Sequence, residues 1–323
     1  MAKFINDNGK FVISLDFEKY WGIRDHSKIS DYQENLDNVD QVVINLLDIF
    51  DKYDIHATWG IVGFLFHKNK KELINKLPTR TDFYDNTELN PYPYLIDKDL
   101  SHKFHFAENL IDKISKKPNQ EIASHTYSHY YALEKGQNAA DFEADLKTFV
   151  SVSNEKGYDI NSIIFPRNQI NESYIPILIK YGVYAYRGNE EHPIYEAGTF
   201  ENNSFTKRTL RLADRYFNIT GHNTYSLSKE AEFYNIKSSR FLAPYINKLK
   251  LLEFLRLRRI KNAMTYAAKN NQIYHLWWHP HNFGKNMKEN FKFLDDILQH
   301  YIYLNQTYGM ESLNIQEVVK GLD

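Results

Sequence analysis

The chain has 323 residues, of which 42% are hydrophobic and 25% are charged, a balance typical of a globular protein with a sizeable core. Its formal net charge of -1 argues against general nucleic-acid binding, which needs a strongly basic surface. Cysteine is absent, which excludes disulfides, thiolate metal ligands and thiol nucleophiles.

Residues 1–10 lack the apolar core of a signal peptide, and no segment has the ~20 uncharged apolar residues that a membrane span needs. We therefore expect a cytoplasmic protein without a transmembrane segment. No internal repeat and no linker divides the sequence, so we expect one domain over 1–323.

The first predicted strand covers 10–18 and opens with an apolar run typical of a strand buried on both faces. Alternation along the strand puts Asp16 and Glu18 on the same face, where two carboxylates are costly unless something pairs with them. A strand that simply runs out into solvent is the alternative. An amphipathic helix over 35–53 and a second strand over 55–63 complete a βαβ unit.

Residues 67–120 include four prolines and many Asn and Asp residues, so we expect an elaborated insertion with helical pieces. The third strand and its turn follow at 121–129 and include His125 and His129. On a helical turn, residues four apart share one face, and both imidazoles could then bind one metal ion. Two unrelated histidines near a helix start are the alternative.

The alternation continues with a helix over 138–156, a strand that Pro166 ends, a helix near 171–181 and a strand over 182–187. Residues 188–240 are polar and fit no clear element. The segment 247–269 has a basic, helical pattern whose leucines point to nearly all sides, so we expect a buried helix with outward basic side chains. An apolar strand over 272–278, a helix near 287–305 and a strand near 312–315 follow.

Repeated strand-then-helix units predict an α/β fold with a parallel sheet or barrel, in which polar residues at the carboxyl ends of strands form the active site. Such residues follow four predicted strands: Asp16 with Glu18, His125 with His129, Arg167, and His279. Two histidines and one carboxylate leave positions open for water, as in catalytic zinc sites.

These motifs resemble those of the polysaccharide deacetylase superfamily, the NodB-homology group also called carbohydrate esterase family 4. The matching stretches are Ser14-Leu15-Asp16-Phe17-Glu18, His125-Thr126-Tyr127-Ser128-His129, Phe165-Pro166-Arg167-Asn168-Gln169 and Leu276-Trp277-Trp278-His279. The resemblance spans nearly the whole chain. It implies a distorted (β/α) barrel with the insertion at about 67–120, forming a single catalytic domain over 1–323.

The chain departs from the family pattern in three places. Phe17 separates two acidic residues that are commonly adjacent in the family. Arg167 follows Pro166 instead of preceding it, so Arg240 is a rival for its place. The aspartate that tunes the family's catalytic histidine has no clear counterpart, and Asp214 is a candidate. Two further histidines compete with the closing one: His275 and His281.

The resemblance implies metal-dependent removal of an N-acetyl group from an amino sugar. The implied metal ligands are Glu18, His125 and His129, and nitrogen-rich ligation favours Zn²⁺. The implied catalytic residues are Asp16 as general base, Arg167 as the cation that orients Asp16, and His279 as general acid. An exchange of roles between Asp16 and Glu18 stays open, as do a packed His279 and an Arg167 that pairs only with a surface carboxylate.

A cytoplasmic member of this family would act on a precursor of a surface polysaccharide, with a nucleotide- or lipid-linked sugar as substrate. The basic helix at 248–261 would suit its phosphates, and peripheral membrane contact would suit a lipid carrier. Trp21 and Trp278 are candidate walls of the site, although large aromatics more often fill cores. The alternatives are an amidohydrolase acting on a small cyclic amide and a non-catalytic carbohydrate-binding protein of the same fold.

Overall fold

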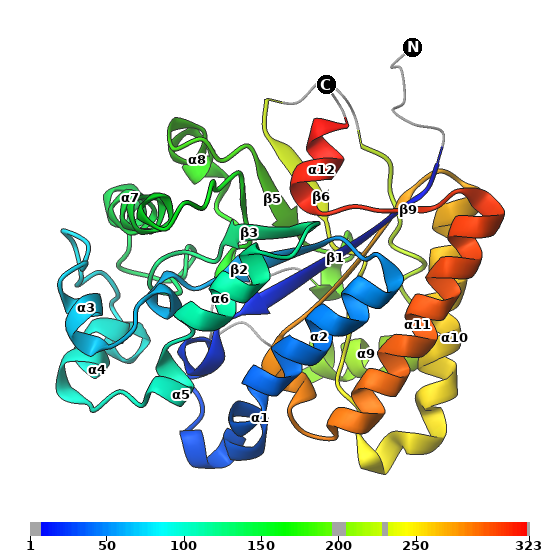
Figure 1. Ribbon diagram of the computed structural model, residues 1–323, viewed down its shortest axis with the longest axis horizontal. Coiled ribbons are helices and arrows are strands. Elements are labelled where there is room, and N and C mark those ends of the chain that lie inside the picture. The colour runs from blue at the N-terminus through cyan, green and yellow to red at the C-terminus, as the bar shows by residue number, and fades with distance from the viewer. Residues whose placement is uncertain (1–7, 196–204, 228–231, 322–323) are drawn as a thin grey trace.

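The computed structural model describes residues 8–195, 205–227 and 232–321, so most of the N-terminal stretch 1–10 lies outside the described residues. A parallel sheet of nine strands forms the centre of this described part (Figure 1). The strands are β1 Lys10–Phe17, β2 Ala57–Ile61, β3 Gln120–Ser124, β4 Ser162–Ile163, β5 Ala185–Gly188, β6 Tyr234–Lys237, β7 Arg240–Phe241, β8 Ile273–Trp278 and β9 Glu311–Ser312. Their order is β6-β5-β4-β3-β2-β1-β8-β7, and β9 pairs with β1.

The two edge strands of this order, β6 and β7, are consecutive parts of one extended segment. β6 pairs with β5, and β7 pairs with β8 at the other edge. Between them, the N–H of Ser238 donates to the carbonyl of Gly188 at 2.8 Å, and the N–H of Ser239 donates to the carbonyl of His275 at 2.8 Å. One segment thus joins both edges, and the predicted distorted (β/α) barrel is confirmed.

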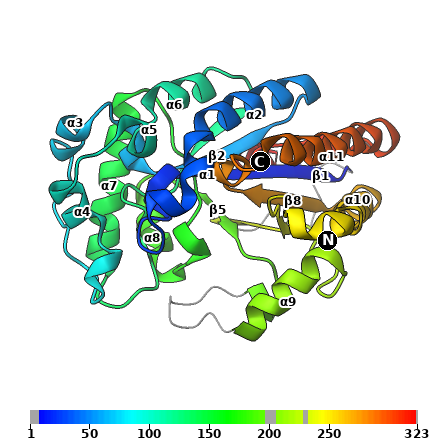
Figure 2. The ribbon, with the colours of Figure 1, turned by 90° about the horizontal axis from the view of Figure 1, so that it is seen from below.

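Helices surround the barrel on its outside (Figure 2). They are α1 Gln33–Asp37, α2 Val39–Tyr53, α3 Lys70–Ile74, α4 Pro91–Asp97, α5 His102–His105, α6 Glu108–Ser115, α7 Ala139–Glu155, α8 Ile175–Lys180, α9 Phe205–Tyr216, α10 Glu253–Lys269, α11 Met287–Tyr308 and α12 Ile315–Lys320. The predicted insertion contains α3 to α6. None of the described helices is both long and apolar enough to cross a membrane.

The helices predicted from apolar spacing form where that spacing occurs. In α2, the buried residues recur every three or four positions and face the sheet. Asn138 caps α7, because its side chain accepts the N–H of Asp141 while the Asp141 side chain accepts the N–H of Asn138. The segment 188–240, which fitted no clear element in the sequence, contains α9, β6 and β7.

Strand alternation divides β1 between two environments. Its odd-numbered apolar residues pack in the main core with the surrounding helices. Val12 faces the opposite way, into a small cluster with Ile236, Ile273 and Ile315 of α12, which closes the end where the strands begin (Figure 1). The same alternation therefore directs Asp16 into the barrel near its carboxyl end.

Candidate metal centre

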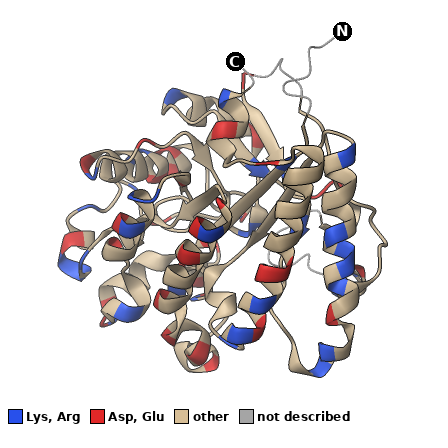
Figure 3. Cartoon of the chain, turned by 45° about the vertical axis from the view of Figure 1, so that its right-hand side comes forward, with Lys and Arg blue, Asp and Glu red and all other residues tan. Residues whose placement is uncertain are grey.

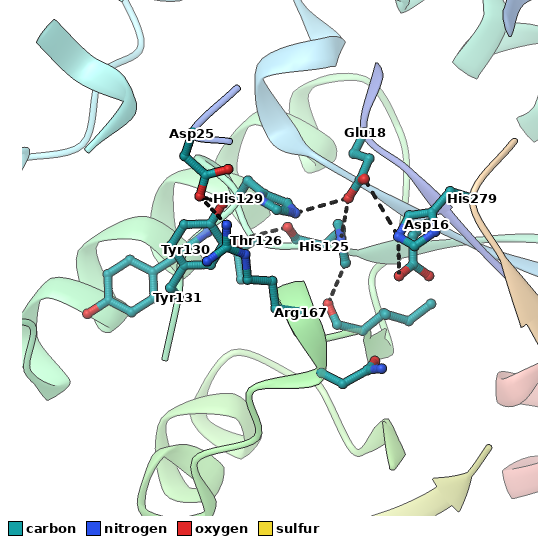
Figure 4. Close-up of polar contacts among 12 residues, drawn as sticks. Asp16, Glu18, Asp25, His125, Thr126, His129, Tyr130, Tyr131, Arg167 and His279 are labelled. Atoms are coloured by element: carbon teal, nitrogen blue, oxygen red, sulfur yellow. Dashed lines mark hydrogen bonds and ion pairs between the residues drawn. The ribbon is translucent and has the colours of Figure 1, made fainter. Parts of the chain in front are cut away.

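The three predicted metal ligands meet beyond the carboxyl ends of β1 and β3 (Figure 4). Oε2 of Glu18 lies 3.3 Å from Nε2 of His125 and 3.0 Å from Nε2 of His129. All three side chains are buried, and their candidate ligand atoms lie within 4.8 Å of one another. This spacing is suitable for binding one ion.

The two histidines lie on a tight loop, so the helical turn considered for their spacing is wrong. Thr126 and His129 both have φ of 60°, in the left-handed region that costs energy for residues other than glycine. Asp145 of α7 holds the loop, because it accepts the backbone N–H groups of Tyr127 at 2.6 Å and Ser128 at 3.0 Å. Burial raises the pKa of Asp145 to about 6, although these hydrogen bonds oppose the rise.

In each histidine, Nδ1 points away from Glu18 and has a hydrogen-bond partner, and this partner determines which ring nitrogen carries the hydrogen. Nδ1 of His125 lies 2.8 Å from the carbonyl oxygen of Ile164, which can only accept, so Nδ1 is the donor. Nδ1 of His129 lies 3.2 Å from the hydroxyl of Tyr131, whose hydrogen goes to Oδ2 of Asp25 at 2.8 Å. The Tyr131 oxygen is therefore free to accept from His129. Each neutral ring then has its lone pair on Nε2.

Two lone pairs thus point at a carboxylate oxygen of Glu18. Such an arrangement is repulsive unless a cation lies between the groups. Protonation of His129 would not relieve this repulsion readily, since burial lowers the pKa of that ring. Burial raises the pKa of Glu18, but the charge of His279 is the largest of the influences that oppose it, and the pKa lies well below its usual value. The donor set and its electrostatics fit a divalent metal ion.

Asp16 has a cationic partner within the barrel. Arg187 of β5 donates from Nη1 to Oδ1 at 2.5 Å and from Nη2 to Oδ2 at 2.9 Å, and both side chains are buried. Burial raises the pKa of Asp16, but the charge and hydrogen bonds of Arg187 act together with the nearby histidines against it, and the pKa is lowered. Asp16 is therefore held ionised and in a fixed orientation.

The expected contact between Arg167 and Asp16 is contradicted. Arg167 and Asn168 both have φ of 54°, and the chain after β4 turns so that Arg167 pairs with Asp25. Its guanidinium carbon lies 4.3 Å from the centre of the Tyr131 ring. Sequence reasoning missed Arg187, although alternation along the fifth strand would have put it inside the barrel.

His279 lies beside both carboxylates. Its Nε2 is 3.6 Å from Oε1 of Glu18 and 3.7 Å from Oδ2 of Asp16, and the side chain is 24% exposed. The two rival histidines are buried, and burial lowers the pKa of each to about 3: His275 and His281. His279 is therefore the histidine of this group best placed to meet a substrate.

The rival Arg240 and the candidate Asp214 pair with each other, with Nη1 2.7 Å from Oδ2. This pair joins β7 to α9, and Asp214 also accepts from Arg259 of α10. Among the described residues, neither Arg240 nor Asp214 forms a hydrogen bond or ion pair with Asp16 or His279. Nδ1 of His279 instead faces the side-chain amide of Asn282 at 3.4 Å.

Neither predicted tryptophan wall lines the site, because both side chains are buried. Trp21 donates its Nε1 hydrogen to the carbonyl of His105 at 2.8 Å, and Trp278 stacks on Phe283. Trp277 is the tryptophan beside the catalytic candidates, with its ring 5.7 Å from that of His279.

A glycine makes room for the Glu18 carboxyl group. A Cβ atom at Gly22 would lie 1.9 Å from Cδ of Glu18, and 2.0 and 2.3 Å from its two oxygens. These separations are far below van der Waals contact. Any side chain at position 22 would therefore displace the predicted ligand.

No protein-family model and no curated protein matches the chain. Solved structures do match it over nearly its whole length. A protein presumed to be a polysaccharide deacetylase, from Mycobacterium smegmatis, is 12% identical with a TM-score of 0.57, and the match covers 100% of this chain and 94% of that chain.

Two structures named for glucan chemistry also match. A GH57-type branching enzyme from Pyrococcus horikoshii is 12% identical with a TM-score of 0.52, covering 98% of this chain and 70% of that chain. A 4-alpha-glucanotransferase from Thermococcus litoralis has the same identity and TM-score, covering 97% and 40%. The structural resemblance to a polysaccharide deacetylase is thus confirmed at the level of the fold, which several activities share.

Proposed function

We propose that the protein is a metal-dependent hydrolase that removes an N-acetyl group from an amino sugar. The observation that carries the proposal is the convergence of the His125 and His129 lone pairs on the Glu18 carboxylate. The site lies at the carboxyl ends of the barrel strands, where barrel enzymes place their active sites.

The proposed ligands are Glu18, His125 and His129. We propose Zn²⁺ as the ion, because imidazole nitrogens and a carboxylate oxygen are typical of catalytic zinc sites with an open position. Such an ion would lower the pKa of a bound water toward about 7 and polarise the acyl carbonyl.

The protein's own proton transfers are assigned to Asp16 and His279. Asp16 takes the proton of the attacking water, and Arg187 keeps it ionised for that purpose. His279, which is partly exposed and 3.7 Å from Asp16, donates a proton to the departing amine nitrogen. Asn282 positions the His279 ring from its outer nitrogen.

The fold neighbours raise glycosidic chemistry as a rival for the same barrel. Glycoside hydrolysis by two carboxyl groups generally needs one of them to be protonated, with a raised pKa, so that it can donate to the leaving oxygen. Both candidates here, Asp16 and Glu18, have lowered pKa values because cationic or histidine partners outweigh burial. Amide hydrolysis is therefore the better match.

We further propose a nucleotide- or lipid-linked precursor of a surface polysaccharide as the substrate, in the cytoplasm or at its membrane surface. The partly buried rings of Trp277 and Phe241 flank His279 and offer apolar faces for a sugar ring. The expectation of one catalytic domain over 1–323 stays a prediction.

Chelation tests this function. Removal of metal should abolish acetate release from N-acetylated sugars, and added Zn²⁺ should restore it, while elemental analysis finds metal in the protein as isolated. Acetate release that is unaffected by metal loss, or that survives His125→Ala, would contradict the proposal.

Two other results identify the rivals. Metal-dependent turnover of small cyclic amides, without acetate release from any sugar, would identify an amidohydrolase. Stoichiometric metal and sugar binding without turnover would identify a carbohydrate-binding protein.

A further inference from the structure

Several arginines gather where α9 packs along α10 and β7, and most of them are paired internally. Arg240 and Arg259 share Asp214, with nitrogen–oxygen distances of 2.7 and 2.8 Å. Arg256 pairs with Glu253 and donates to the carbonyl of Ala243. The expectation that the basic side chains of this helix point outward is therefore wrong for its two buried arginines, Arg256 and Arg259.

Arg215 of α9 differs from these neighbours. No hydrogen bond or ion pair joins its half-buried side chain to any residue that the structure describes. Burial lowers the pKa of Arg215, and the like charge of Arg256 adds to the decrease, against the opposing effect of Tyr195 and Tyr216. A half-buried guanidinium without a carboxylate partner is available to bind an anion.

Arg215 is linked to His279 through one aromatic ring. Its guanidinium carbon is 6.0 Å from the ring centre of Phe241, whose ring is 5.9 Å from that of His279 and 4.7 Å from that of Trp277. Figure 2 shows α9 next to α10, and Figure 3 shows the basic residues along α10. The Phe241 ring thus separates the unpaired cation from the proposed proton donor.

We propose that Arg215 binds a phosphate group of the substrate, so that the enzyme acts on a phosphorylated or diphosphate-linked N-acetyl amino sugar. The sugar would lie along Phe241 and Trp277, with its acyl group at the metal centre and its phosphate at Arg215. A guanidinium presents paired N–H groups that match two phosphate oxygens. This inference rests on the proposed function.

The test compares an N-acetyl amino sugar with its anomeric phosphate, using the metal-loaded protein. Arg215→Gln should raise KM for the phosphorylated substrate by about 10- to 100-fold, the range for a lost charge-assisted contact, and should leave kcat/KM for the neutral sugar unchanged. Lys288→Gln removes the same charge from the exposed side of α11, outside the basic helix, and should change neither value. Equal effects of Arg215→Gln on both substrates, or no effect, would overturn the proposal.

Binding separates failure of this inference from failure of the proposed function. Calorimetry with the phosphorylated sugar should show tight binding to the wild type, weak binding to Arg215→Gln and intermediate binding to Arg215→Lys, which keeps the charge but loses the paired donors. If no acetate is released from any sugar, the proposed function fails, while this comparison still decides whether Arg215 binds phosphate. Thermal unfolding of each variant checks that it is folded.

The carrier of the phosphate is decided by the same assay. A nucleoside-diphosphate sugar and a short-chain lipid-diphosphate sugar present the same anion to Arg215. Whichever has the larger kcat/KM, and loses more of it in Arg215→Gln, identifies the natural class. Preference for the neutral sugar over both would contradict the proposal.

Discussion

A glutamate lies buried near each end of the barrel, and the pKa values of the two are shifted in opposite directions. Near the amino end, Glu121 accepts hydrogen bonds from the hydroxyls of Thr58 at 2.7 Å and Ser162 at 2.5 Å, and from the N–H of Gln316 at 3.1 Å. Burial raises its pKa, and these bonds offset only part of the rise. Near the carboxyl end, Glu18 is as deeply buried, yet its pKa is well below its usual value.

The opposite pKa shifts show which neighbours distinguish a functional carboxyl group from a structural one. Neutral donors around Glu121 tie β2, β3 and β4 to α12, and a carboxyl group suits that role in either protonation state. Glu18 has a lowered pKa, with the charge of His279 as the main influence against burial, and its carboxylate faces Nε2 of His125 and of His129. A buried carboxylate that is kept charged, among groups that can bind a metal, is therefore the more informative sign of function.

Of the substitutions considered, the exchange of each glutamate for glutamine should give the largest difference between the two ends of the barrel. Glu18→Gln removes the only anionic ligand proposed, so we expect loss of bound metal. Activity should fall by more than about 100-fold, which exceeds the usual effect of removing a group that only hydrogen-bonds to a metal ligand. Glu121→Gln should keep both metal and activity and should lower the free energy of unfolding by about 1–3 kcal/mol, because one buried acceptor becomes a donor. Metal analysis, acetate assays and thermal unfolding measure these effects.

Metal retained by Glu18→Gln at wild-type content would show that the carboxylate is not a ligand. Metal lost from Glu121→Gln would show that the amino end is not independent of the site.

The next largest difference is expected between Arg187, which pairs with Asp16, and Arg167, which pairs with Asp25. Asp16 must be ionised to act as a base, so activity is present above its folded pKa and lost as the pH falls through it. In Arg187→Gln, burial acts without the opposing cation, so the acid limb of kcat/KM should move to higher pH and kcat should fall by about 10²- to 10⁴-fold. Arg167→Gln should leave that limb in place.

Arg187→Lys is the control for a folding defect. Because lysine keeps the positive charge, the acid limb of kcat/KM should lie close to its wild-type position in this variant. An acid limb that moves in Arg167→Gln and not in Arg187→Gln would reverse the assignment of the partner of Asp16.

The smallest of these effects concerns the outer partner of a proposed ligand. Tyr131→Phe removes the acceptor for Nδ1–H of His129, so the metal should bind about 10-fold more weakly. Tyr130→Phe is a matched control, because its hydroxyl bonds to Gln137 at 2.7 Å and points away from the histidines (Figure 4). Competition with a chelator measures both affinities, and equal values for the two variants would contradict the role of Tyr131.

The sequence predicted the parts of the site that follow directly from a strand. Asp16 and Glu18 stand out because they end an apolar run, and His125 and His279 do so because polar residues at strand ends gather in a barrel. Their convergence in the structure needs only strand direction and alternation.

The missed parts depend on contacts between distant segments. Arg187 pairs with Asp16 across 171 positions, while Arg167 lies in the segment that resembles the family's arginine motif. Asp25 and Tyr131 reach His129 through loops whose left-handed residues no pattern predicts. The segment that closes the barrel, β6 with β7, cannot be recognised in the sequence because each of the two strands is short and polar.

The ligand Glu18 can keep its position only while residue 22 is glycine. The residue contributes no atom to the ion, yet the space it leaves is filled by the carboxyl group of Glu18. A lineage that keeps the glutamate ligand must also keep a bare position four residues later, and a mutation there would disable the centre without touching a ligand.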